Sequence, residues 1–390
     1  FYKRQDLIRR RWLYNKFYVA NFNVDYKNDN LEIITGLSYS NYVGDHFGEV
    51  IWAQQFSTDA SIGDRYYFSD AKKTDFSIFS KATFKINNKV NAYLDLQGRF
   101  VNYKTNGLTS NRVLIDVDEN FSFFNPKLGL TYAVNKRNNL YLSYARANRE
   151  PNRDDFEDNS SVKPEKLNDF ELGWRLKTRS IKLNTNVYYM AYKDQLVLTG
   201  AIDDVGARVR SNSDKSYRLG LEVDADITLS KKFSVKPNFA LSDNKNKDFI
   251  TLKDGVLQNI GNTHISFSPN FIAGNAFVYH PKENFQVALF SKYVSEQYMG
   301  NIDEESSKLD SYFINDLNVI YNFKPKKIFK DITLTALVNN IFNKEYVANG
   351  YFGSYDYDDP SSTTGITTGH YSGYYPQATT NFLVGATFKF

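Results

Sequence analysis

Apolar and polar residues alternate with a period of two along most of the chain. The clearest case is the C-terminal end, where every second position is apolar: Phe382, Val384, Ala386, Phe388 and Phe390. This period matches the alternating side-chain directions of a β-strand and predicts one apolar and one polar face. The chain is therefore expected to end in a two-faced strand.

The same alternation recurs upstream, in segments of similar length. They are residues 76–86, 90–100, 181–191, 219–229, 265–279 and 332–342. The predicted strands are about 10 to 15 residues long, whereas strands of globular sheets average about 5–6. A tilted strand that crosses a bilayer needs about 9–11 residues. The lengths therefore favour membrane-crossing strands.

The predicted connections fall into two classes that alternate along the chain. The tight ones, rich in Asn, Lys and Ser, are residues 28–30, 87–89, 135–138, 178–180, 230–232, 280–284 and 324–327. The long, irregular ones are roughly residues 44–74, 104–120, 148–167, 196–215, 243–262, 300–308 and 349–378. Short turns at one rim and long loops at the other are typical of transmembrane β-barrels. The first long segment is also long enough to contain further strand.

Seven tight turns delimit fourteen strands, and residues 379–390 add a fifteenth. Single-chain bacterial barrels have an even number of strands. We therefore predict an all-β fold, an antiparallel transmembrane β-barrel of which this chain supplies about 15 strands of a presumed ~22. Short turns would be periplasmic and long loops extracellular. The chain begins at Phe1 without a starting Met, and we expect it to be a fragment or a processed piece.

Composition agrees with this prediction. The 390 residues include 29 Tyr and 31 Phe but no Cys, and the mean hydropathy is −0.51. No run approaches the ~18 apolar residues of a transmembrane helix, but alternating barrel strands keep the average hydropathy low. The net charge of +4 is small for this length and indicates no nucleic-acid partner.

No catalytic constellation is evident. The four histidines, His46, His264, His280 and His370, are scattered without zinc-ligand spacing. Neither a nucleophile elbow nor a phosphate-binding or dinucleotide-binding glycine motif occurs. We therefore expect a protein that is not an enzyme and that has no cofactor and no metal site.

The candidate ligand-binding residues lie mainly in the aromatic segment 351–375. We predict that four tyrosines stack on a ligand and that four polar residues contact it. The tyrosines are Tyr355, Tyr357, Tyr371 and Tyr374, and the polar residues are Arg149, Asp356, Asp359 and His370. Tyrosine-rich loops grip flat or apolar ligands in this way. Alternatively, the rings pack on neighbouring loops or line the mouth of a barrel, and the acidic residues bind a cation or are simply solvated.

Aromatic residues also gather near the ends of predicted strands. They are Phe170, Trp174, Tyr321, Phe323, Phe388 and Phe390. Such residues form girdles at lipid headgroups in barrels. They would otherwise be core aromatics, but a sheet without helices offers no second layer to cover them.

An ordered series of motifs resembles a known family. It contains N-P-K-L-G-L-T-Y from Asn125, K-P-E-K-L-N-D-F-E-L-G-W from Lys163, L-V-N-N-I-F-N-K-E-Y from Leu337 and Y-Y-P-Q-A-T-T-N-F-L-V-G-A-T-F-K-F from Tyr374. In this order the motifs resemble the C-terminal barrel of TonB-dependent outer-membrane receptors, over most of residues 120–390.

The resemblance implies a location in the outer membrane of a Gram-negative bacterium and contact with outer-membrane lipid. It also implies a receptor that captures a scarce nutrient with its extracellular loops and imports it by a TonB-driven movement of an N-terminal plug. Residues 1–390 would be barrel only, with the plug and the TonB-contacting segment outside this chain. The haem branch has a histidine between its two boxes, whereas none lies between Pro151 and Lys163. This counts against haem, and the glycan receptors of the family are usually longer than this chain. A siderophore, a metal complex or cobalamin is therefore expected rather than haem or a glycan. The alternatives are a passive porin or another outer-membrane barrel without energy coupling, and a soluble all-β interaction or enzyme domain.

Overall fold

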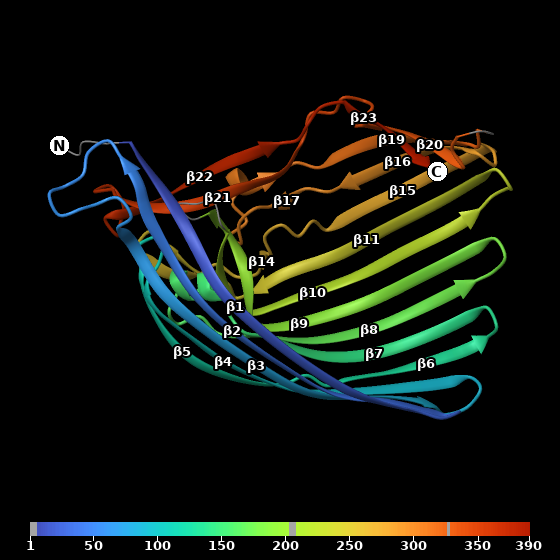
Figure 1. The fold of residues 1–390 in the computed structure, drawn as a ribbon, viewed down its shortest axis with the longest axis horizontal. Helices are drawn as coiled ribbons and strands as arrows, with labels where there is room; N and C mark the ends of the chain where they lie inside the picture. The colour runs from blue at the N-terminus through green and yellow to red at the C-terminus, as the bar shows by residue number, and fades with distance from the viewer. Residues whose placement is uncertain (1–5, 203–207, 326–327) are drawn as a thin grey trace. The chain divides into compact units, whose positions relative to one another are not determined.

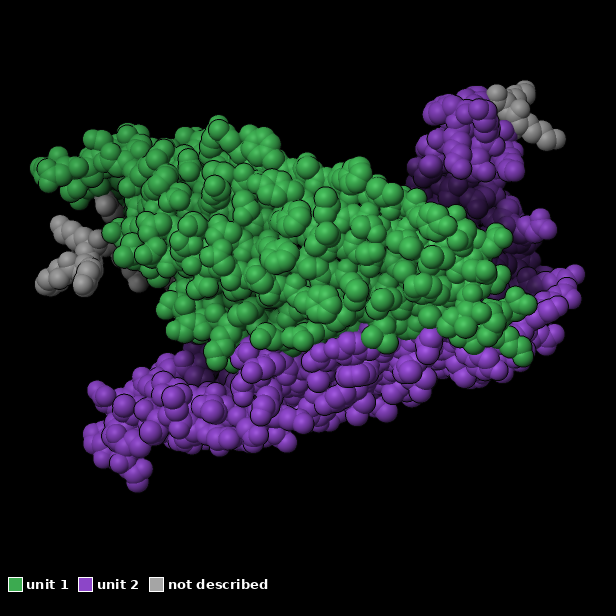
Figure 2. All heavy atoms as spheres, turned by 90° about the horizontal axis from the view of Figure 1, so that it is seen from below, with its two compact units in different colours: residues 1–129, 145–167, 209–212 green, residues 130–144, 168–208, 213–390 purple. Residues whose placement is uncertain are grey.

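The computed structural model describes residues 6–202, 208–325 and 328–390, and these residues form an almost purely antiparallel β structure (Figure 1). This confirms the predicted all-β class. Among the described residues, no helix is both long and apolar enough to cross a membrane. The chain divides into two compact units, coloured in Figure 2, and each is described by itself.

Unit 1 contains residues 1–129, 145–167 and 209–212. Its first five strands pair in chain order, each antiparallel to the next. They are β1 (Leu7–Lys27), β2 (Leu31–Ala53), β3 (Arg65–Lys85), β4 (Val90–Leu108) and β5 (Leu114–Phe124). A one-and-a-half-turn helix, α1 (Arg153–Asp158), also belongs to this unit.

Unit 2 contains residues 130–144, 168–208 and 213–390. Its antiparallel ladder runs β10–β11–β15–β16–β19–β20–β23. These strands are β10 (Arg208–Thr228), β11 (Phe233–Lys247), β15 (Phe271–Lys282), β16 (Phe285–Val294), β19 (Tyr312–Phe323), β20 (Asp331–Asn339) and β23 (Asn381–Lys389). β9 (Ile181–Ile202) belongs to this unit too, and β6 (Lys127–Asn135), β7 (Asn138–Arg149) and β8 (Glu165–Lys177) contribute residues to both units.

Further elements of unit 2 lie in its long connections, outside the main ladder. They are β12 (Ile250–Lys253), β13 (Val256–Asn259), β14 (Thr263–His264), β17 (Gln297–Tyr298), η1 (Glu305–Ser307), β18 (Lys308–Leu309), β21 (Val347–Asp358) and β22 (Ile366–Pro376). These elements are left out of the strand count, and β5 and β6 are counted as one strand that is interrupted at Asn125–Pro126. The described residues then contain the fifteen long strands that the sequence predicts.

The tight turns share one physical design. In the turn after β1, the Asn28 side-chain oxygen accepts hydrogen bonds from the backbone N–H groups of Asn30 and Leu31. Asn87 and Asn135 do the same in their turns, and hydroxyl groups replace the amide at Thr178 and Ser230. These Asx and Ser/Thr turns satisfy backbone donors where the chain reverses. The predicted turn at 324–327 extends into residues 326–327, which lie outside the described residues.

The predicted long loops are partly wrong. Residues 44–53 and 65–74 continue β2 and β3, so the loop between these strands covers only residues 54–64. The segment 349–378, predicted as irregular, contains the β21–β22 hairpin. Glycine and charged residues interrupt the apolar alternation at these strand ends, so the period-two signal fades although the backbone ladder continues.

The two faces of the unit 1 sheet differ in burial and polarity. Cross-strand neighbours Tyr39, Phe76 and Phe100 are all exposed on one face, while Ser77, Val101 and other residues of opposite parity are buried. A soluble sheet would bury its apolar face instead. This inverted pattern is typical of a barrel wall that faces lipid.

Candidate functional site

The β21–β22 hairpin carries seven of the eight predicted ligand-binding residues. Its turn is built around Asp359, whose backbone N–H donates to the Gly365 carbonyl at 2.9 Å. The Asp359 carboxylate accepts from the hydroxyls of Ser361 and Thr367, which lowers the pKa of this carboxyl. Asp359 therefore has an evident structural role in closing the turn.

One face of the hairpin is a continuous row of aromatic rings, which we call the tyrosine ribbon. It consists of Tyr351, Tyr355, Tyr357, Tyr371 and Tyr375. Neighbouring ring centroids are 6.0 to 6.4 Å apart, within the range of favourable aromatic pairs. Four of the rings stay roughly half exposed, the fractions for Tyr355 and Tyr371 being 53% and 45%.

Glycines opposite the tyrosines let the rings lie flat on the hairpin. In the strand register Gly353 faces Tyr371 and Gly373 faces Tyr351. A Cβ atom on Gly353 would lie 2.3 Å from the Tyr371 ring, and one on Gly373 would lie 2.2 Å from the Tyr351 ring. Only glycine accommodates this approach. The ribbon is thus a pre-formed aromatic surface whose ring positions are set by the backbone.

Three of the predicted residues point the other way. His370 stacks on Phe352 with ring centroids 5.4 Å apart, and its Nδ1 lies 2.9 Å from the Ser354 hydroxyl. The Tyr374 hydroxyl donates to the Ser306 carbonyl, and Asp356 accepts from the Thr368 hydroxyl at 2.6 Å. The structure therefore brings Tyr355, Tyr357 and Tyr371 together and separates them from Tyr374, Asp356 and His370.

This second face anchors the hairpin to the rest of unit 2. Phe352 is buried with Met299 and Leu309, which are 3%, 0% and 2% exposed. Next to this cluster, Asn301 accepts from the Ser266 backbone N–H at 2.9 Å and donates to the Leu198 carbonyl at 2.6 Å. The long connections of unit 2 thus share a small apolar core and a buried polar hub, and the sequence alone did not indicate either.

A second contact joins the hairpin to β12–β13. The Asp254 carboxylate accepts from the Thr368 backbone N–H at 2.9 Å, and the Asp254 N–H donates to the Thr368 hydroxyl at 2.6 Å. Beside this reciprocal pair is a cavity of about 230 Å³. Its lining includes Asp303, Glu304 and His370.

Charged groups near this cavity are paired. The His370 Nε2 atom lies 3.8 Å from a Glu304 oxygen, and the His264 Nδ1 atom lies 3.0 Å from Asp303. Lys245 approaches His264 Nε2 at 2.6 Å. Because an ammonium can only donate, this nitrogen accepts, and Nδ1 carries the proton given to Asp303. Among the residues that the structure describes, no group of three or more His, Asp or Glu is placed to hold a metal ion.

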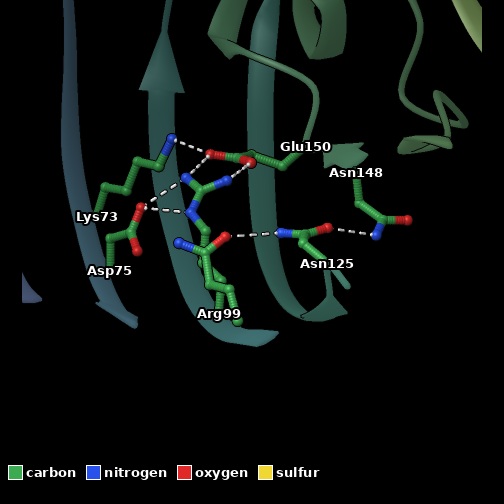
Figure 3. Close-up of polar contacts among 7 residues, drawn as sticks. Lys73, Asp75, Arg99, Asn125, Asn148 and Glu150 are labelled. Carbon is green, nitrogen blue, oxygen red and sulfur yellow. Dashed lines mark hydrogen bonds and ion pairs between the residues drawn. The ribbon is translucent and has the colours of Figure 1, made fainter. Parts of the chain in front are cut away.

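The eighth predicted residue, Arg149, belongs to unit 1. It is exposed and pairs with Glu165 at 3.1 Å. Its neighbour Glu150 is almost buried and accepts from Lys73 and Arg99, each at 2.7 Å, and Arg99 also donates to Asp75 (Figure 3). The sequence analysis missed this ion-pair network, because nothing in the N-R-E-P stretch shows which strands face it.

The Glu150 network secures the chain as it leaves β7. Asn148 donates to Asn125, which donates to Gln97 (Figure 3). Just beyond, Arg153 donates to the Ser69 hydroxyl at 2.6 Å, and Phe156 of α1 packs on Tyr103. The segment that follows Glu150 is therefore fixed to the wall of unit 1.

Comparison with known proteins identifies the family. A sequence model described as "TonB dependent receptor-like, beta-barrel" matches residues 2–341. The chain belongs to the TonB-dependent receptor β-barrel family. This confirms the resemblance seen in the sequence, and members of the family reside in the outer membrane of Gram-negative bacteria, which is where this chain is located.

The relatives include receptors for siderophores. The catecholate siderophore receptor Fiu of Escherichia coli (strain K12) is 20% identical over 271 residues, which are 65% of this chain and 33% of Fiu. The ferrioxamine receptor of Yersinia enterocolitica is 23% identical over 330 residues, 84% of this chain and 44% of that receptor. This chain thus spans less than half the length of these TonB-dependent receptors.

Solved structures confirm the barrel fold. The copper transporter OprC matches with a TM-score of 0.73 at 14% identity, covering 98% of this chain and 58% of OprC. The ferric citrate transporter FecA in its unliganded form matches with a TM-score of 0.66 at 17% identity, covering 99% of this chain and 56% of FecA.

Proposed function

We propose that this chain is the barrel portion of an outer-membrane receptor that imports a ferric siderophore or a similar metal chelate. The observation that carries the proposal is the exposed tyrosine ribbon on an anchored hairpin of a TonB-dependent receptor barrel. The names of its relatives, a catecholate siderophore receptor and a ferrioxamine receptor, support the same ligand class.

The ribbon suits a flat chelate for a physical reason. Tyr351, Tyr355 and Tyr371 lie over glycines and the rings of the ribbon contact one another, which reduces the side-chain freedom to be lost when a ligand binds. Aromatic contacts contribute roughly 0.5–1.5 kcal/mol each beyond the area that they bury. Tyr355, Tyr357 and Tyr371 are the proposed stacking residues, and their hydroxyls supply hydrogen bonds at the edges of the ligand.

The remaining predicted residues take different roles in this proposal. His370, Tyr374 and Asp356 position the hairpin, because each already contacts another part of unit 2 or the opposite strand. The ring contact of His370 with Phe352 also leaves this histidine poorly suited as an axial ligand. This favours a siderophore over haem.

Energy coupling is a further part of the proposal. A plug domain that fills the barrel and a TonB-contacting segment would belong to the same receptor and would convert ligand capture into transport. A receptor of this kind binds and translocates its ligand without chemical conversion, so we propose no enzymatic activity. The alternative is a passive porin.

Growth on single iron sources tests the proposed function. The full-length gene is expressed in a strain without its own siderophore receptors, in the presence and absence of TonB. We expect growth on at least one ferric siderophore only when TonB is present. Equal growth without TonB would instead establish a passive pore.

A further inference from the structure

The tyrosine ribbon presents the faces of its rings to solvent. A Cβ atom on Gly369 would lie 2.7 Å from the Tyr355 ring, and Gly353 is approached in the same way by Tyr371. These rings lie flat on the hairpin, so one face of each is turned away from the backbone. Tyr355, Tyr357 and Tyr371 all remain roughly half exposed. Because the face of an aromatic ring carries negative potential, it attracts cations and repels anions.

Carboxylates surround the hairpin that carries these rings. Five of them belong to it or contact it: Asp254, Glu304, Asp356, Asp358 and Asp359. Among the residues that the structure describes, none of the five forms an ion pair with a lysine or an arginine. Glu304 lies 3.8 Å from the His370 Nε2 atom, and Asp254 accepts from the Thr368 backbone N–H. No direct lysine or arginine partner therefore neutralises these charges.

Two of the carboxylates lie directly behind the rings. Asp356 and Asp358 alternate with Tyr355 and Tyr357 along β21, so their side chains leave the strand on the opposite face. A cation over the rings would be on the order of 10 Å from them. At that distance each carboxylate adds a modest attraction, and the attractions add together and weaken as salt is raised. The rings and the carboxylates thus favour the same sign of charge.

The lysines near the hairpin do not reverse this balance. Lys308 lies 3.1 Å from Glu296 and 3.7 Å from Glu305, so it is already matched by two carboxylates. Lys253 directly precedes Asp254 at the turn between β12 and β13. The carboxylates around the hairpin therefore outnumber the unpaired lysines.

A guanidinium lies at the opposite end of the ribbon. Arg208 donates to the Asn349 side-chain oxygen at 3.2 Å and lies 5.0 Å from the Phe267 ring. In the strand register Asn349 faces Tyr375, at the base of the hairpin. Asp358, near the turn, is about 30 Å away along the strand. The ribbon is thus polarised, with a cation at its base and carboxylates at its turn.

We propose that the tyrosine ribbon selects a metal chelate that carries a cationic group, and that this group binds over Tyr355 and Tyr357. The inference rests on the proposed function and names the class of chelate. The ring faces attract the cation directly, and Asp356 and Asp358 attract it through the hairpin. The oxygen-rich end of the chelate points toward Arg208. Both the rings and the carboxylates disfavour an anionic chelate.

Equilibrium binding of three ferric chelates to the full-length receptor tests this selection. The first is a linear tris-hydroxamate with a free terminal amine, which is cationic. The second is the same chelate with its amine acetylated, which is neutral. The third is an anionic tris-catecholate. The first two share one metal centre and differ mainly in charge, so the ratio of their dissociation constants isolates the contribution of the cationic group.

The test variant is D356N/D358N, which removes both carboxylates behind the rings. An asparagine at position 356 keeps an oxygen that can accept from the Thr368 hydroxyl. The control variant is D29N/E283Q, which makes the same charge change at two exposed carboxylates of the tight turns. Unchanged affinity of D356N/D358N for the neutral chelate verifies that the ribbon is intact.

We expect the wild type to bind the cationic chelate about tenfold more tightly than the neutral one, and the anionic chelate most weakly. The ratio should fall to about threefold in D356N/D358N and stay at about tenfold in the control. It should also shrink as salt is raised from about 0.1 M to about 1 M, because the screening length falls from about 10 Å to about 3 Å.

Two results would overturn the inference and leave the proposed function standing. One is equal affinity of the wild type for the cationic and the neutral chelate, and the other is tightest binding of the tris-catecholate. An unchanged ratio in D356N/D358N would contradict the part assigned to the carboxylates. Binding of none of the three chelates would instead contradict the ribbon as a chelate site, and with it the proposed function.

Discussion

At the scale of single residues, the side chains of this barrel are fixed by their cross-strand neighbours. Tyr371 lies over Gly353, between Tyr351 and Tyr355. Glu150 is held by two cations from two different strands. Both arrangements depend on strand register, and register places residues far apart in the sequence next to each other.

The glycine beneath Tyr371 provides a test of the ribbon. In Gly353→Ala the new methyl group would overlap the ring, so the exposed Tyr371 side chain must move away from the hairpin. We expect faster nitration of Tyr371, followed by mass spectrometry of the full-length protein. Gly98→Ala is the control, because its nearest neighbour would be at an ordinary 3.6 Å. Unchanged nitration in G353A would show that the rings are not held by the glycines.

The contribution of the Glu150 ion-pair network to stability can be tested by two variants at neighbouring positions, one inside the network (Glu150) and one outside it (Arg149). Glu150→Gln leaves Lys73 and Arg99 without their shared counter-charge, and we expect a loss of about 3 kcal/mol in the free energy of unfolding. Arg149→Gln breaks an exposed pair and should change it by less than about 1 kcal/mol. Denaturant unfolding of the full-length protein in detergent measures both. Similar values for the two variants would contradict the role of Glu150.

At the scale of elements, sequence patterns predicted the long strands and tight turns but not the hairpin of the site. The turns can be predicted from the sequence because asparagine favours them: the side-chain oxygens of Asn28, Asn87 and Asn135 accept hydrogen bonds from backbone N–H groups of the turn. In β21–β22 the positions between tyrosines are glycines, so the face has no hydrophobic alternation to detect. Consequently the tyrosines were predicted as one group, although Tyr374 lies on the opposite face.

Two reciprocal hydrogen bonds between Asp254 and Thr368, which we call the latch, join the β12–β13 hairpin to the β21–β22 hairpin and can be removed by mutation. Replacing both partners, as in D254A/T368V, removes the reciprocal hydrogen bonds between β12–β13 and β22, together with the hydroxyl bond from Thr368 to Asp356 inside the β21–β22 hairpin. We expect faster amide hydrogen exchange in residues 250–259 and unchanged exchange in β15 and β16. Gln258→Ala is the control, since the side-chain hydrogen bond of Gln258 among the described residues stays within its own hairpin, at the Lys253 carbonyl. Equal exchange in all three proteins would show that the latch does not stabilise this segment.

At the scale of the whole molecule, the alternation of short and long connections predicted the architecture, because it reflects two rims in different surroundings. Seven tight turns predict fourteen strands, the C-terminal segment predicts a fifteenth, and the described residues contain these fifteen long strands. The lengths of the loops could not be predicted. Strands continue past the last alternating apolar residues, because backbone pairing does not depend on that alternation. The contacts among the long connections arise from tertiary packing of Met299, Leu309 and Phe352, which are distant in sequence.

The tyrosine ribbon is proposed to bind a metal chelate, and the affinity for that ligand reports on this contact. The measurement is the equilibrium dissociation constant of the full-length protein for the ferric siderophore that supports growth. The Y355A/Y357A/Y371A variant should bind about 100-fold more weakly, since three aromatic contacts of about 1 kcal/mol each are lost. Y374A, on the other face, should stay within about threefold of the wild type. Wild-type affinity in the triple variant would contradict the claim.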